Sequence, residues 1–123
     1  MKNLNTCFLT GNLTSDAELK TSQDGKARLV FSIACNEDVK SGDEWVKKIA
    51  YVPCVIFGSM RAQKLEQYLL KGTKVALTGK LNYSSWEDDQ GNKKSRLDVC
   101  VYELEFLSTK TSNEPPSDQD IEF

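Results

Sequence analysis

Two tryptophans and three other aromatic residues are the side chains of this sequence best suited to binding chemistry. Trp86 stands in a polar stretch, residues 83–89, where no position for a hydrophobic core is evident. An aromatic residue in such a setting is typical of a contact residue, because its flat face stacks on unpaired nucleobases and contributes ~1–3 kcal/mol per base. Four further aromatic residues fall in strand-like or hairpin segments that suit the same purpose: Trp45, Tyr51, Phe57 and Tyr83.

Some of these aromatic positions also fit a purely structural role. Phe57 suits a core position as well as a binding one, and Trp45 can simply cover the entrance of its strand. Tyr51 and Phe57 lie on one face only if the strand runs unbroken through Pro53, whose missing N–H favours a bulge or a sheet edge. These alternatives stay open at the level of sequence.

Nucleic-acid binding also requires cations that follow the phosphate backbone. The candidates are scattered among carboxylates along the first 107 residues: Lys2, Lys20, Arg28, Lys47, Lys48, Lys71, Lys74, Lys80, Lys93, Lys94 and Arg96. Any single one of them is most simply a solvated surface residue. Their clustering depends on the fold.

The net charge of -2 hides an asymmetry between the body and the tail. Residues 1–107 carry fifteen basic and fourteen acidic residues, whereas residues 108–123 carry one basic and four acidic residues. The last six residues of the tail are acidic or polar except for an apolar pair, Ile121 and Phe123, and largely polar positions precede them. A partner protein with an apolar pocket and a basic rim would recognise the terminal ring together with its free α-carboxylate.

Several kinds of chemistry are excluded or disfavoured. The chain has no histidine, so histidine bases and histidine metal ligands are absent. Its four cysteines are widely spaced without a CxxC pair, which favours buried free thiols over disulfides and predicts no metal and no cofactor. A nuclease using Asp88, Asp89 and Asp98 is disfavoured because the first two carboxylates point apart, so we expect no catalytic residues.

The hydrophobic pattern predicts five strands and one helix in a single domain, residues 1–107. The expected strands are Asn5–Leu13, Ala27–Asn36, Trp45–Phe57, Lys74–Tyr83 and Arg96–Leu107. The expected helix starts at Ser59 as N-cap and ends before Gly72, and a long loop is expected over residues 84–95. This order predicts an all-β fold, the five-stranded Greek-key OB (oligonucleotide/oligosaccharide-binding) barrel with one helix between its third and fourth strands.

The composition changes after Leu107. Residues 108–123 are polar and acidic, so we expect a disordered tail. No apolar stretch approaches the ~20 residues needed to cross a bilayer, and no signal-peptide pattern follows Met1, so we expect a soluble intracellular protein without a membrane partner.

Short motifs along the chain resemble the bacterial single-stranded DNA-binding protein (SSB) family. The resemblance covers residue 5 to about 107 together with the last six residues. It is carried by the order and spacing of six segments: Gly11–Leu13 with Asp16–Lys20, Phe31–Ala34, Val55–Gly58, Tyr68–Gly72, Val75–Gly79 and Trp86–Gly91.

The resemblance implies an OB-fold homotetramer that coats single-stranded DNA in the bacterial cytoplasm, associated with the nucleoid. Trp86 and Phe57 match base-stacking positions of the family, and Tyr51 stands where a stacking Trp is frequent. Lys2, Lys20 and Lys71 match basic contact positions. The acidic tip is implied to recruit replication, repair and recombination proteins through four residues: Asp118, Asp120, Ile121 and Phe123.

The sequence departs from the family pattern at positions that affect binding. Val39 stands where well-known members carry a Trp, and Glu122 replaces the proline of the tip. Positions that are commonly basic in the family are uncharged here: Pro53, Ser59, Asn82, Ser84 and Ser85. Fewer phosphate contacts predict weaker binding and a shallower dependence of affinity on salt.

The sequence therefore predicts a non-enzymatic protein that binds single-stranded DNA without sequence preference. The alternative is an OB-fold protein-interaction module of the replication-restart type with weak DNA affinity. The low basic content favours this alternative, whereas Trp86 and the acidic tip argue against it.

Overall fold

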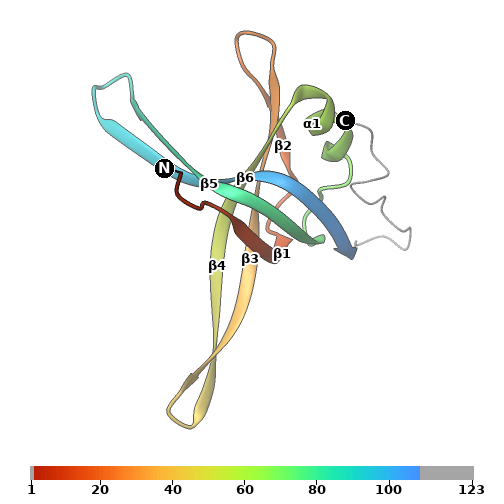
Figure 1. Cartoon of the computed structure of the whole chain (residues 1–123), viewed down its shortest axis with the longest axis vertical. Coiled ribbons are helices and arrows are strands. Elements are labelled where there is room, and N and C mark those ends of the chain that lie inside the picture. Colours follow the sequence, from red (N-terminus) through yellow and green to blue (C-terminus); the bar gives the residue numbers. More distant parts are fainter. Residues whose placement is uncertain (1, 109–123) are drawn as a thin grey trace.

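Alternating apolar residues form the strands, and burial follows the alternation. In β3, Leu29, Phe31 and Ile33 are buried whereas the residues between them are half-buried. The computed structural model describes residues 2–108, and Figure 1 shows its elements. In chain order they are β1 (Cys7–Leu13), β2 (Glu18–Thr21), β3 (Ala27–Ser41), β4 (Glu44–Phe57), α1 (Ser59–Glu66), β5 (Lys74–Glu87) and β6 (Lys93–Ser108).

Five of the six strands close into a barrel. β1 pairs with β5 and β3, β5 pairs with β6, and β4 joins β3 to β6 through a short parallel pairing at Cys54–Val99 and Val55–Cys100. At the β1–β3 junction a Cβ on Gly11 would lie 2.7 Å from the carbonyl oxygen of Ala34, so closure requires glycine there. The predicted OB barrel with one helix after its third long strand is confirmed.

The barrel core is apolar, and α1 covers one part of it. Leu29, Ile33, Ile56 and Val75 are fully buried inside the barrel. On the helical side Ala62, Leu65 and Leu69 join the same core. Among residues 2–108 no helix is long and apolar enough to cross a membrane.

All four cysteines are free thiols, as the sequence favoured. Cys54 is buried in the core, and Cys7, Cys35 and Cys100 are half-buried. Burial raises the pKa of Cys54 to about 12 and also raises that of Cys35, so both thiols favour the neutral form.

The helix is shorter than predicted and its cap differs. Gly58, with φ 103°, occupies the N-cap position in place of Ser59, whose hydroxyl oxygen instead accepts the Ala27 N–H at 2.8 Å. The helix ends at Glu66, before the predicted boundary at Gly72. The reason is tertiary: the Gly72 N–H donates to the Leu13 carbonyl, and the Leu69 carbonyl accepts the Ala17 N–H, both at 2.9 Å.

Two strand pairs extend beyond the barrel as long hairpin arms, which the sequence pattern underestimated (Figure 1). The β3–β4 arm stays paired out to Ser41 opposite Glu44, and the β5–β6 arm out to Glu87 opposite Lys93. Most of residues 84–95, predicted as a loop, are therefore strand. Backbone pairing holds these arms while both faces stay exposed, so they lack the buried/exposed alternation that marks a strand.

The short strand β2 was also missed, because only Leu19 of its four residues is even partly buried.

β4 pairs with β3 without a break through Pro53. On its other side β4 pairs with β6 only at Cys54 and Val55, so Pro53 lies beside an edge where no strand of the described chain is paired. The predicted tail and its residues Asp118, Asp120, Ile121 and Phe123 lie outside the described residues.

Candidate nucleic-acid interface

The strand register places Phe57 beside two cations on one outer face of the barrel. Phe57 of β4 pairs with Arg28 of β3, and Arg28 pairs with Lys20 of β2. The neighbouring core residue Leu29 pairs with Leu19 and Ile56 on the opposite face, which fixes the outward direction of the row. The half-exposed Phe57 (51%) and the two basic residues are therefore cross-strand neighbours in one row over β2, β3 and β4.

Tyr51 and Trp45 continue this face along β4. Successive side chains of a strand alternate in direction, so residues 45, 51 and 57 of the unbroken strand point to the same side. Tyr51 is 67% exposed, and Trp45 is 70% exposed near the tip of the β3–β4 arm, opposite Lys40. The exposure of Phe57 excludes the core position that the sequence left open for it.

Trp86 reaches the same face from the other arm. Val55 of β4 pairs with Cys100 of β6, and from Cys100 the alternation runs without a register shift to Lys94. Lys94 pairs with Trp86, whose side chain is 47% exposed. The side chain of Trp86 therefore points to the same face as those of Tyr51 and Phe57.

A polar cavity of about 190 Å³ provides independent evidence that these strands share one face. It is lined by Lys20 of β2, Ser32 of β3 and Arg96 of β6, together with residues of the β1–β2 connection. A larger cavity of about 650 Å³ lies beside Phe57 and is lined by Lys26, Arg28 and the Gly58–Ser59 backbone region. The face thus has both polar and apolar recesses next to aromatic rings.

Three of the residues selected from sequence are not brought into this face by the register. Tyr83 precedes Trp86 by three residues on β5, so its side chain points to the opposite face, and it pairs with the exposed Leu97. Lys2 lies exposed before β1, in a segment where the Asn5 side chain forms two 2.9 Å hydrogen bonds with the Leu81 backbone. Lys71 lies in the connection after α1.

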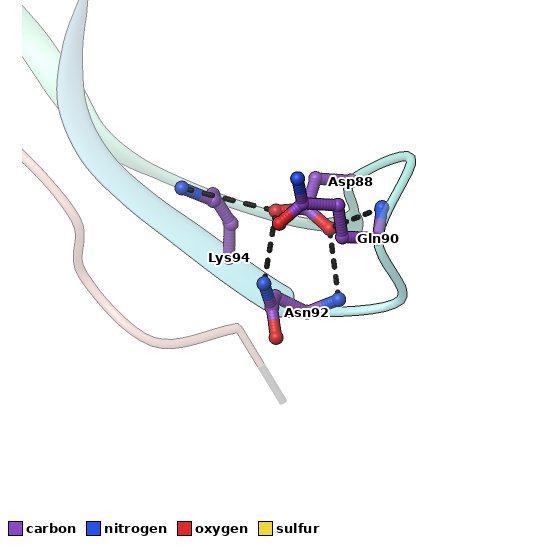
Figure 2. A network of polar contacts seen from close by, with 4 residues as sticks. All are labelled: Asp88, Gln90, Asn92 and Lys94. Atoms are coloured by element: carbon purple, nitrogen blue, oxygen red, sulfur yellow. Dashed lines mark hydrogen bonds and ion pairs between the residues drawn. The ribbon is translucent and has the colours of Figure 1, made fainter.

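The carboxylate of Asp88 and two backbone hydrogen bonds, Asp88 N–H to the Asn92 carbonyl and Gly91 N–H to the Asp88 carbonyl, hold the tip of the β5–β6 arm (Figure 2). Asp88 Oδ1 accepts the backbone N–H groups of Gln90 at 2.9 Å and Asn92 at 2.8 Å. Its other oxygen lies 4.0 Å from the Lys94 ammonium. Asp88 therefore contributes to the turn that follows Trp86. Among the described residues no group of three or more His, Cys, Asp or Glu could hold a metal ion.

The model of the single-strand binding protein family matches residues 4–107. The chain belongs to this family. A single-stranded DNA-binding protein of Borreliella burgdorferi is 40% identical over 122 residues, which cover 98% of this chain and 81% of the relative. The protein of the same description from Treponema pallidum is 37% identical over 109 residues, covering 89% of this chain and 61% of the relative.

The OB fold of this family member is shared with a solved structure, the "Plasmodium falciparum SSB complex with ssDNA". The match has a TM-score of 0.77 at 24% identity and covers 88% of this chain and 98% of the other. The resemblance expected from the short motifs is thus confirmed, and so is the fold.

Arg28 and Arg96 are residues of this face that the sequence offered as candidate cations but did not single out. Each was one of many scattered cations, and neither stands in a distinctive motif. Arg28 becomes notable only through its pairing with Phe57, and Arg96 only through the cavity shared with Lys20 and Ser32. Finding them required the pairing register.

Proposed function

We propose that this chain binds single-stranded DNA without sequence preference. The observation that carries the proposal is the shared face: the register brings Tyr51 and Phe57 of β4 and Trp86 of β5 to one side of the molecule. Membership of the single-strand binding protein family supports the same conclusion. Relatives that carry the name single-stranded DNA-binding protein add to it.

Binding combines two interactions that do not depend on base identity. Every base has a π face, so stacking on exposed aromatic rings tolerates any sequence and contributes ~1–3 kcal/mol per base. Cations beside the rings, such as Arg28 and Lys20 in the row with Phe57, neutralise phosphates and release counterions. Covering the strand in this way protects it during replication, repair and recombination, and no catalytic group is needed.

The arms lengthen the binding face beyond the barrel. Trp45 near the end of the β3–β4 arm and Trp86 near the end of the β5–β6 arm extend the aromatic positions outward in two directions (Figure 1). A flexible single strand can follow both arms, whereas a stiff duplex cannot unstack its bases to reach the rings. The proposal therefore includes a strong preference for single strands over duplex.

Titration of a fluorescently labelled oligo-dT tests this proposal. We expect saturable binding that an unlabelled single strand displaces and a duplex of equal length displaces poorly. Equal competition by the duplex, or no saturable binding by folded protein, would contradict it.

One observation favours the alternative function, a protein-interaction module with weak DNA affinity. Acidic residues stand beside or opposite several arm cations: Asp88 near Lys94, and Glu37 paired across the strands with Lys48. Carboxylates at these places lower the attraction of the arms for phosphate. Weak binding in the oligo-dT titration, with no preference for single strands, is the result that this alternative predicts.

We further propose a homotetramer and recruitment of replication and repair proteins by the C-terminal tip. β1 pairs with β5 over residues 7–12, but with β3 only at Asn12 and Leu13, so most of its second edge has no strand partner within the described chain. An open edge beside the exposed Phe8 is suited to pairing with a second copy. Sedimentation tests the assembly: a monomer at micromolar concentration would contradict it.

Deletion of residues 118–123 tests the tip. We expect the shortened chain to lose its partner proteins in pull-down experiments and to bind oligo-dT as well as, or better than, the full chain. The physical reason is that a tethered polyanion no longer competes with DNA. Loss of DNA binding in this variant would contradict the assignment of the tail to protein partners.

A further inference from the structure

A buried carboxylate lies beneath Arg96 on β6. Asp98 is only 9% exposed and is the buried charged residue among residues 2–108. Its Oδ2 lies 3.5 Å from Nε of Arg96, and its Oδ1 accepts a hydrogen bond from the Asn82 side-chain amide at 3.3 Å. Burial of a charge is costly unless the charge is paired, so this arrangement indicates that Asp98 holds its partner in place.

The contact through Nε leaves the far end of the guanidinium available. A guanidinium has five N–H donors in a rigid fork, and the two terminal nitrogens match two oxygens of one phosphate. The Arg96 side chain is about half exposed (46%) although its carboxylate partner is not. A side chain anchored at one nitrogen and open at the others is suited to bidentate binding of an anion.

Arg96 meets groups from two other strands at the polar cavity of about 190 Å³. Lys20 contributes a second cation, and Ser32 contributes a hydroxyl group. Asp16 and Glu18 also line this cavity, and Asp16 Oδ1 accepts the Lys71 backbone N–H at 2.8 Å. Two cations beside two carboxylates favour an anion of low charge, such as a phosphodiester, over a free phosphate dianion.

The cavity is on the same face as the aromatic positions. Lys20 belongs to the row that ends at Phe57, and Arg96 pairs with Ser84, two residues before Trp86. An anionic group bound there would belong to the stretch of strand that passes from one ring to the other.

We propose that Arg96, positioned by Asp98, forms with Lys20 and Ser32 a binding site for one internucleotide phosphodiester. The inference rests on the proposed binding of single-stranded DNA and adds a specific subsite to it. Arg96 is the contacting residue, and Asp98 is a positioning residue that acts through it.

The salt dependence of oligo-dT affinity tests the site. For single strands the slope of log affinity against log salt changes by about 0.7 for each phosphate contact. We expect Arg96→Ala to make the slope shallower by about this amount. Lys93→Ala is the matched control, because it removes one positive charge three residues away, on the opposite face of β6, and should leave the slope nearly unchanged.

Two outcomes of this experiment have different meanings. If the wild-type chain fails to bind oligo-dT, the proposed function itself is wrong. If the wild type binds but Arg96→Ala and Lys93→Ala have equal slopes, DNA binding stands and the phosphodiester site is overturned.

The positioning role of Asp98 has its own test. Arg96→Lys keeps the charge but loses the Nε anchor and the fork, so we expect a nearly unchanged slope with several-fold weaker binding. Full affinity in Arg96→Lys would overturn the positioning role. In the background of Asp98→Asn, we expect Arg96→Ala to weaken binding less than it does in the wild type. A larger effect there would show that Asp98 only neutralises Arg96.

Free phosphate distinguishes the ligand class. At constant ionic strength, replacing chloride by inorganic phosphate should leave the affinity for oligo-dT almost unchanged if the site prefers a diester. Strong competition by inorganic phosphate that disappears in Arg96→Ala would overturn the assignment to a phosphodiester.

Discussion

Arg28 lies directly opposite Phe57 in the antiparallel pairing of β3 with β4. A cation and a half-exposed ring are therefore direct cross-strand neighbours, and both line a cavity of about 650 Å³. Stacking of a base on the ring would bring a backbone phosphate within reach of the guanidinium. The two residues thus represent the two interactions that the binding proposal combines.

Substitution separates these two interactions. We expect Phe57→Ala to weaken oligo-dT binding by ~1–3 kcal/mol with an unchanged salt slope, because it removes a stacking surface but no charge. Arg28→Ala should instead make the slope shallower by about 0.7. Fluorescence titrations at several salt concentrations measure both quantities. A salt slope altered equally by the two variants would contradict the division of roles.

Trp86 and Tyr83 form a matched pair on β5. They are three residues apart and both exposed, but they point to opposite faces of the arm. We expect Trp86→Ala to cost ~1–3 kcal/mol of binding free energy and Tyr83→Ala to cost much less. Competition titrations with oligo-dT measure the two costs. Equal losses would show that DNA contacts both faces of the arm.

Asp88 should control the order of the hairpin tip. Asp88→Ala removes the acceptor of the Gln90 and Asn92 backbone N–H groups. Asp88→Asn keeps one acceptor oxygen for them and loses the contact with Lys94 and the 3.4 Å hydrogen bond from the Asn92 side-chain amide. We expect faster amide hydrogen exchange at both positions in the alanine variant, by an amount equivalent to ~0.5–1.5 kcal/mol per lost bond. Exchange rates like those of the wild type in Asp88→Ala would show that the turn forms without this carboxylate.

The thiol of Cys54 should be inert in the folded protein. Burial, with smaller contributions from Cys35 and Asp98, raises its pKa from 9.0 to about 12, and the thiolate is the reactive form. Mass spectrometry after iodoacetamide treatment near pH 8 should show Cys54 labelled last in native protein and all four thiols labelled in urea. Early labelling of Cys54 in native protein would contradict its burial.

The same pKa shift affects stability at high pH. The folded chain keeps the Cys54 proton to a higher pH than the unfolded chain does. Its stabilising contribution is therefore complete below about pH 9 and is lost as the pH rises towards about 12. Unfolding by urea at increasing pH should show this decline.

The barrel was predictable because its residues obey a simple burial pattern. Leu29, Phe31 and Ile33 alternate with less buried neighbours, and Ala62, Leu65 and Leu69 cover the core from the helical side. Such alternation is visible in the sequence. The order of these elements was enough to identify the OB fold.

The arms and β2 were not predictable in this way. Residues 84–87 and 93–96 are exposed on both faces, so backbone pairing maintains the strand without a buried side to mark it. The end of α1 was misplaced because contacts with Leu13 and Ala17, remote in sequence, fix the segment before Gly72.

The aromatic part of the interface followed from residue types, whereas its charged part did not. Trp86 was identifiable as a ring in a polar segment. Arg96 looked like any other surface cation until its contact with Asp98 and its cavity with Lys20 were visible. Lys20 lies on β2 and Arg96 on β6, strands that are far apart in the sequence and do not pair with each other, so only the assembled barrel brings them to one cavity.

Intrinsic fluorescence of the Trp45→Phe variant is the most direct test of the binding face. The chain has two tryptophans, so this variant reports on Trp86 alone. Titration with oligo-dT should give strong, saturable quenching that weakens as salt is added, because bases stack on the indole while phosphates compete with salt ions. Folded protein that binds oligo-dT without any change in Trp86 emission would contradict the proposed interface.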